Sequence, residues 1–173
     1  YGVFAAGSRS KFMTFDVDIA NNESLAKWTT MRLVNVLMDD FNISADDIHV
    51  SFSGNKGYHV DLFFDETIAV ATLKEFHSKV LSIFGKIEGG DIEFRPTWQQ
   101  GVKLPLGIHQ KTGNRAWYCD TVKLEPIEDF THITTIQPME ADEFLLLNES
   151  VEVVEVVEEE KAEQFVEVAT DID

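Results

Sequence analysis

A regular alternation of apolar and polar residues over 11–19 constrains the fold more than any other feature of this chain. The sequence KFMTFDVDI places Asp16 and Asp18 between three apolar residues, Phe15, Val17 and Ile19. Successive side chains of a β-strand point to opposite faces of its sheet. The pattern therefore predicts a strand with one apolar face and one face that carries two carboxylates.

Further helix and strand patterns follow along the first 120 residues. Apolar residues at helical spacing predict helices over 24–41 and over 66–85, the second with Gly85 as its C-cap. Strand patterns cover 48–53, 58–64 and 89–96, and the pattern over 101–120 indicates strand, loop, strand. The order β-α-β-β-α-β-β predicts an α+β fold with a mostly antiparallel sheet and flanking helices.

The charge of the chain is unevenly distributed. The net charge is −17 over 173 residues, but residues 124–173 hold 16 of the 31 acidic side chains and 1 of the 14 basic ones. The part before residue 124 is close to neutral, which leaves room there for a local basic groove. We expect one domain over 1–147, with 125–147 packed on its edge. We expect an acidic tail or linker over the Glu- and Val-rich 148–173.

Cysteine content and hydropathy exclude several classes of protein. The single cysteine, Cys119, rules out a disulfide within the chain, and no zinc site is expected. No apolar run approaches the roughly 18 residues that span a bilayer, so we expect a cytoplasmic protein with no membrane partner. The sequence begins with Tyr1 rather than Met, and we expect it to be a fragment of a longer chain.

The stretch VSFSGNKGYHVDLFF, residues 50–64, interrupts a hairpin with a polar loop. Its glycines allow backbone N–H groups to approach a ligand, and consecutive N–H groups in a turn can bind an anion. Ser53, Lys56 and His59 add a hydroxyl, a positive charge and an imidazole. Together they favour a polyphosphate site. The alternative is an ordinary glycine-containing hairpin with a surface lysine.

Two further groups of residues suggest chemistry. Asp16 and Asp18 share one face of their strand and could hold Mg²⁺ or Mn²⁺, although a solvated strand face would show the same pattern. The segment 91–115 holds the densest group of cations in the chain, and an acid, Asp91, stands at its start. Glu93 is the alternative to Asp91 as a third metal ligand. The structural alternative for this segment is a charged hairpin.

These three stretches resemble, in order and spacing, the motifs of the archaeo-eukaryotic primase superfamily. That superfamily includes replicative primase catalytic subunits and primase-polymerases. The matching segments are FDVD, SGNKGYH, and GGD followed by KLPLGIHQKTG, and they lie within residues 12–120. Two positions differ: Asn55 stands where replicative primases often have a second basic residue, and Gly90 replaces a large apolar residue.

The resemblance implies a catalytic domain over 1–147 that performs template-directed nucleotidyl transfer by a two-metal mechanism. It implies that Asp16, Asp18 and Asp91 are the catalytic residues and hold two Mg²⁺ or Mn²⁺ ions. It also implies a set of nucleotide-binding residues: Ser53, Gly54, Asn55, Lys56, His59, Lys103, His109 and Lys111. The implied partners are nucleoside triphosphates, a single-stranded DNA template and a helicase or other replication module.

Two rival functions stay open at this point. One is a non-catalytic relative that binds nucleotide or nucleic acid within a replication or defence complex. The other is a nuclease or a different nucleotidyl-transfer enzyme with a three-acid metal site, although a nuclease does not need a triphosphate cradle. Among the aromatic residues, we expect Trp28 in the core, whereas Trp98 and Trp117 either pack in the core or at the domain edge or stack on template bases.

Overall fold

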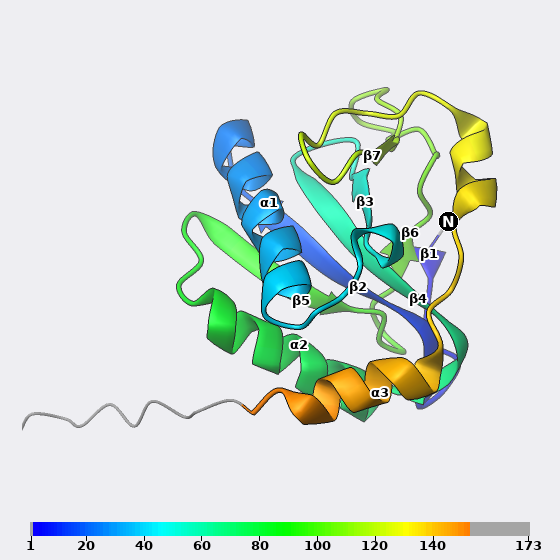
Figure 1. Cartoon of the computed structure of the whole chain (residues 1–173). Helices are drawn as coiled ribbons and strands as arrows, with labels where there is room; N and C mark the ends of the chain where they lie inside the picture. Colours follow the sequence, from blue (N-terminus) through cyan, green and yellow to red (C-terminus); the bar gives the residue numbers. More distant parts are fainter. Residues whose placement is uncertain (1, 153–173) are drawn as a thin grey trace, which may run out of the picture.

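A five-stranded antiparallel sheet forms the centre of the computed structural model, which describes residues 2–152 (Figure 1). The strand order is β5-β2-β4-β3-β7. The strands are β2 (Arg9–Ile19), β3 (His49–Phe52), β4 (Gly57–Ala69), β5 (Gly90–Arg95) and β7 (Tyr118–Cys119). A separate antiparallel pair joins β1 (Gly2–Val3) to β6 (Val102–Lys103). The predicted α+β fold with a mostly antiparallel sheet is confirmed.

The connections follow a split β-α-β pattern, in which β2 and β3 flank β4 and two helices complete the crossovers. The helices are α1 (Glu23–Asp39), α2 (Val70–Phe84) and α3 (Ala141–Ser150), with short 3₁₀ turns η1 (Ala45–Asp47) and η2 (Phe130–Thr135). Asn22 caps α1 by accepting a hydrogen bond from the backbone N–H of Leu25 at 2.9 Å. Figure 1 shows α1 and α2 over the sheet and α3 alongside α2.

The helices α1 and α2 cover the apolar face of the sheet, opposite the face that carries the two aspartates of β2. Phe15, Val17 and Ile19 are completely buried in the core, as their alternation with the two aspartates predicts. Phe144 of α3 closes the core from the end: its ring centroid lies 4.7 Å from those of Phe64 and Phe76. No helix within residues 2–152 is long and apolar enough to cross a membrane.

Several predicted elements are corrected by the structure. The helix predicted over 66–85 begins only at Val70, because β4 continues to Ala69 and its last residues pair with Arg9 and Ser10 of β2. The side chain of Arg9 also donates hydrogen bonds to Thr67, which stabilises this extension. Of the two strands predicted within 101–120, each is only two residues long, and they belong to different sheets.

The region after residue 124 contains a helix that the sequence pattern did not predict. Residues 125–147 include η2 and most of α3, and α3 continues to Ser150. Asn148, the first residue of the predicted acidic tail, is buried, and its carbonyl accepts a hydrogen bond from Lys79 at 2.7 Å. The remainder of that tail, residues 153–173, lies outside the described part of the chain.

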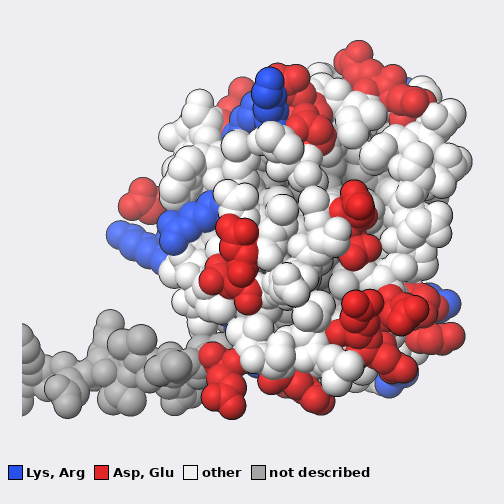
Figure 2. Space-filling view, viewed as in Figure 1, with Lys and Arg blue, Asp and Glu red and all other residues white. Residues whose placement is uncertain are grey.

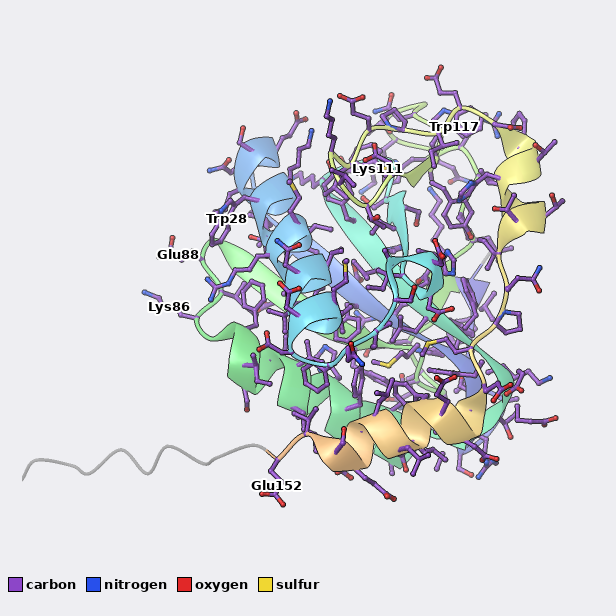
Figure 3. The ribbon with its side chains drawn as sticks, viewed as in Figure 1. Trp28, Lys86, Glu88, Lys111, Trp117 and Glu152 are labelled. Atoms are coloured by element: carbon purple, nitrogen blue, oxygen red, sulfur yellow. The ribbon has the colours of Figure 1, made fainter. Side chains whose placement is uncertain are left out.

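The prediction that Trp28 belongs to the core is wrong. Its side chain is 53% exposed on the outer side of α1, where it points away from the sheet (Figure 3). The guanidinium of Arg32 lies 5.5 Å from its ring centroid, and this cation–π contact occupies part of the indole. On the face shown in Figure 2, acidic side chains form separate groups, so the large negative net charge does not make one continuous patch there.

Candidate active site

The acidic side chains of β2 and β5 face away from the helices, on the open side of the sheet. The antiparallel register places Asp91 opposite Asp18 and Glu93 opposite Asp16. Glu93 forms a short ion pair with Arg95 of its own strand, whereas Asp18 and Asp91 are exposed. Asp91 is therefore better placed than Glu93 to act together with the two aspartates of β2.

Glycines on both neighbouring strands allow close approach to the backbone of β2 beside Asp18. A Cβ added to Gly57 of β4 would lie 2.0 Å from the carbonyl oxygen of Val17. A Cβ added to Gly90 of β5 would lie 1.9 Å from the carbonyl oxygen of Asp18. Both distances are far below van der Waals contact, so any larger residue would push the strands apart. This explains Gly90 at a position where the primase motif has a bulky residue.

The loop between β3 and β4, residues 53–57, is held in place mainly by Ser53. Its hydroxyl oxygen accepts hydrogen bonds from the N–H groups of Asn55 at 3.4 Å and Gly57 at 3.1 Å. Its own N–H donates to the carbonyl of Gly57 at 2.9 Å and closes the hairpin. Because two loop N–H groups already have a partner, the backbone offers fewer free donors to an anion than the sequence pattern suggests. The side chain of Lys56 reaches from the loop to Asn21 at 3.5 Å.

A segment after β6 packs against this loop from the open side. Gly54 has a positive φ of 86°, and a Cβ at this position would lie 2.7 Å from the Cβ of His109. The hydroxyl of Thr112 donates to the carbonyl of Gly54 at 2.5 Å. His109 and Asn114 in turn close a tight turn, with the N–H of His109 2.8 Å from the carbonyl of Asn114. His109 of this segment and Lys103 of β6 thereby line one cavity together with Asp16 and Asp18 of β2.

A cavity of about 480 Å³ lies between these parts. It brings together most of the residues that were predicted as site residues, and Gly57 lines it as well. The predicted residues in the lining are Asp16, Asp18, Ser53, Asn55, Lys56, His59, Lys103 and His109. Three selected residues do not line it. Gly54 packs against His109, Asp91 lies across from Asp18 on β5, and Lys111 is exposed in the 109–114 turn.

Two residues that line the cavity, Lys103 and His109, each have a buried side-chain nitrogen atom. The amine of Lys103 and Nδ1 of His109 are both enclosed, and within the described residues neither has a hydrogen-bond partner. A buried amine without a partner is costly, because it loses its hydration and receives nothing in exchange. An anionic ligand in this cavity would supply the missing acceptor for Lys103.

The residues can also accept divalent metal ions, judged by their chemistry. Within residues 2–152, no group of three or more His, Cys, Asp or Glu side chains is gathered closely enough to hold a metal ion. Mg²⁺ commonly binds through one or two carboxylates together with water and substrate phosphates, so it does not require a closed protein cage. Asp16 and Asp18, at one end of a cavity whose other end is cationic, fit that mode.

His59 and Asp16 form the main polar pair of the cavity. Nε2 of His59 lies 3.3 Å from Oδ1 of Asp16 on the neighbouring strand. Burial acts to lower the pKa of His59, but the hydrogen bond and charge of Asp16, helped by the charge of Asp61, outweigh it and raise the pKa above its ordinary value. His59 is consequently more cationic near neutral pH than a free histidine.

Asp61 is a buried acid that the sequence analysis missed. It follows His59 by two residues on β4 and shares its face, and it is only 4% exposed. The hydroxyl of Thr14, on β2, lies 2.5 Å from its carboxylate. Burial raises the pKa of Asp61 to about 6, and the hydrogen bond from Thr14 and the charge of His59 only partly oppose this. The i, i+2 spacing from His59 was the signal that could have revealed it.

Comparisons with known proteins point in the same direction as the motifs. No family model matches the chain. The chain is 32% identical over 71 residues to the DNA primase small subunit PriS of Methanosarcina mazei, and 30% identical over 71 residues to PriS of Methanosarcina acetivorans. Each match covers 41% of this chain and 16% of the relative. The chain is thus similar, over part of its length, to a small part of archaeal primase small subunits.

Proposed function

We propose that this chain is the catalytic core of a DNA primase or primase-polymerase, which joins nucleoside triphosphates on a single-stranded DNA template. One observation supports the proposal most: Asp16, Asp18 and Lys103 line the same cavity, and the amine of Lys103 is buried with no hydrogen-bond partner among the described residues. Carboxylates next to a cationic anion-binding end are the arrangement that metal-dependent phosphoryl transfer requires. The partial likeness to primase small subunits supports the same assignment.

The residues would divide the work according to their chemistry. Asp16, Asp18 and Asp91 would hold two Mg²⁺ or Mn²⁺ ions, which supply activation of the attacking 3′-oxygen and neutralisation of the triphosphate. Lys56, Lys103 and His59 would bind and orient the phosphate groups, and His109 would contact a phosphate or the sugar. A helicase or another replication module is the proposed partner outside this part of the chain.

A nucleotide-binding relative without catalysis is the main rival. It would need the cationic end of the cavity but not the acids of β2 and β5. A nuclease would need the acids but not the cradle for a triphosphate. Because the cavity combines both groups of residues, nucleotidyl transfer accounts for more of the site than either rival does.

Primer synthesis and primer extension on single-stranded DNA, with Mg²⁺ and with Mn²⁺, test the proposal. Asp18→Asn and Asp91→Asn should remove incorporation, since metal binding needs the carboxylates. Both side chains are exposed, so neither change should disturb folding.

Glu93→Gln is the matched control. It makes the same chemical change on the same strand as Asp91→Asn, but Glu93 is already paired with Arg95 and should be dispensable. Equal loss in the Asp91 and Glu93 variants would reject Asp91 as the third ligand. A wild-type chain that binds triphosphate but never incorporates it would favour the non-catalytic relative.

A further inference from the structure

A second cavity, of about 450 Å³, lies on the other side of the β3–β4 loop. Tyr58 lines it, and because Tyr58 precedes His59 on β4, the two side chains leave the sheet on opposite faces. The second cavity is therefore on the face that carries α1. Lys56, at the tip of the loop, lines both cavities and marks the point where they adjoin.

The walls of this cavity are rich in aromatic rings. Phe52 and Tyr58 are paired across β3 and β4, with ring centroids 5.6 Å apart at an angle of 61°. Trp117 stands next to them, because its carbonyl accepts a hydrogen bond from the N–H of Phe52 at 2.9 Å. The guanidinium of Arg115 lies 5.6 Å from the Trp117 ring centroid and adds a planar cation. We call this group of four residues the aromatic pocket.

The rim of the aromatic pocket provides polar groups of both signs. Lys56 contributes a cation, and Glu23 and Glu128 contribute carboxylates. A purely apolar partner would leave all three without a use. A carboxylate accepts hydrogen bonds from exocyclic amino groups, which adenine, guanine and cytosine present. Aromatic walls with a cation on one side and acceptors on the other therefore match a nucleobase attached to a phosphate.

We propose that the aromatic pocket binds one unstacked nucleobase, with the adjoining phosphate at Lys56. The proposal rests on the proposed function for its choice of a nucleic acid as ligand. The base could belong to the single strand that serves as template or to a free mononucleotide, since both present the same chemistry. Figure 3 shows Trp117 and Lys111 at the end of the molecule away from α3.

Fluorescence of Trp117 can report binding directly. Trp28 and Trp98 are 53% and 72% exposed and lie outside the pocket, so replacing both with Phe should leave Trp117 as the one tryptophan of a folded protein. Deoxyadenosine monophosphate and a tetramer of deoxyadenylate should quench its emission. A tetramer with abasic sites should not. Tighter binding of the tetramer identifies a strand as the source of the base, and equal affinity identifies the free nucleotide.

Substitutions distinguish the pocket from the catalytic cavity. In the single-tryptophan protein, Phe52→Ala should weaken binding roughly 10-fold or more, as loss of an aromatic stacking partner does. Asp18→Asn should leave quenching unchanged although it removes incorporation. Quenching by the abasic tetramer, no effect of Phe52→Ala, or equal competition by phenylalanine amide would overturn the pocket proposal. Quenching without any incorporation would leave the pocket standing and reject the proposed function alone.

Discussion

Replacement of Lys103 by methionine should raise the stability of the protein and lower its affinity for a nucleoside triphosphate. Lys103 lines the cavity, and its amine is buried and has no hydrogen-bond partner within the described residues. Methionine keeps most of the length and volume of the side chain but removes the amine. The variant should be more stable than the wild type without ligand, and it should bind triphosphate more weakly.

The expected magnitudes follow from the two roles of the amine. An unsatisfied buried polar group costs about 1–3 kcal/mol, so its removal should raise the free energy of unfolding by about 1 kcal/mol or more. For a chain of this size, 1 kcal/mol corresponds to roughly 2–4 °C in Tm. A charge-assisted hydrogen bond to phosphate contributes about 1.5–3 kcal/mol, so triphosphate affinity should fall roughly 10- to 100-fold.

Thermal unfolding without ligand and titration with a nucleoside triphosphate measure the two effects. Titration with the monophosphate is the ligand control, and its affinity should change far less, because it lacks the phosphates that Lys103 is proposed to contact. Lys111→Met is the matched variant, since Lys111 is exposed and does not line the cavity. It should change neither property. A lower Tm for Lys103→Met, or unchanged triphosphate binding, would refute the account of Lys103 as an anion ligand.

Three further predictions concern the framework of the site. Gly57→Ala should lower the free energy of unfolding, measured with urea, by about 2–3 kcal/mol, because the new Cβ would lie 2.0 Å from a carbonyl oxygen of β2. Gly107→Ala is the control and should be tolerated, because its Cβ would make only ordinary contacts. Asp61 has a raised pKa of about 6, so it contributes stability that is present below pH ~4 and is lost as the pH rises through 6. Asn does not titrate, so the free energy of unfolding of Asp61→Asn minus that of the wild type should increase between pH 4 and 6, by on the order of 2–3 kcal/mol. A difference that does not change with pH would contradict the assignment. A chain ending at residue 152 should retain nucleotide incorporation and the Tm of the full chain. A chain ending at residue 147 should have a lower Tm, because it lacks the buried Asn148.

The sequence predicted the centre of the fold well because that part follows simple periodic rules. The alternation around Asp16 and Asp18 defined both faces of β2, and the structure confirms the buried side. The glycine-rich loop was placed correctly between two strands for the same local reason. The function of the cavity stays a prediction, but the structure does bring most of the selected side chains together around it.

The failures occurred where distant contacts override local pattern. The segment 66–69 has residues compatible with a helix, yet it extends β4 because Arg9 and Ser10 offer it a pairing partner. Trp28 is spaced from the apolar residues of α1 as a residue on the buried side of the helix would be, yet its side chain is exposed. Phe144 reaches the core only because α3 packs against α2 and β4, and nothing near it in the sequence predicts those partners.

Histidines show most clearly why residue type alone does not identify a site. His77 is buried among rings on the helix-covered face, 5.1 Å from Phe15, and burial lowers its pKa to about 4. His59 is half-buried on the opposite face of the sheet, yet the carboxylates of Asp16 and Asp61 raise its pKa. The same side chain is thus neutral on one face and favoured as a cation on the other. The decisive difference is the two nearby acids: Asp61 lies two residues further along the same strand, whereas Asp16 is placed beside His59 by strand register, which the sequence does not display.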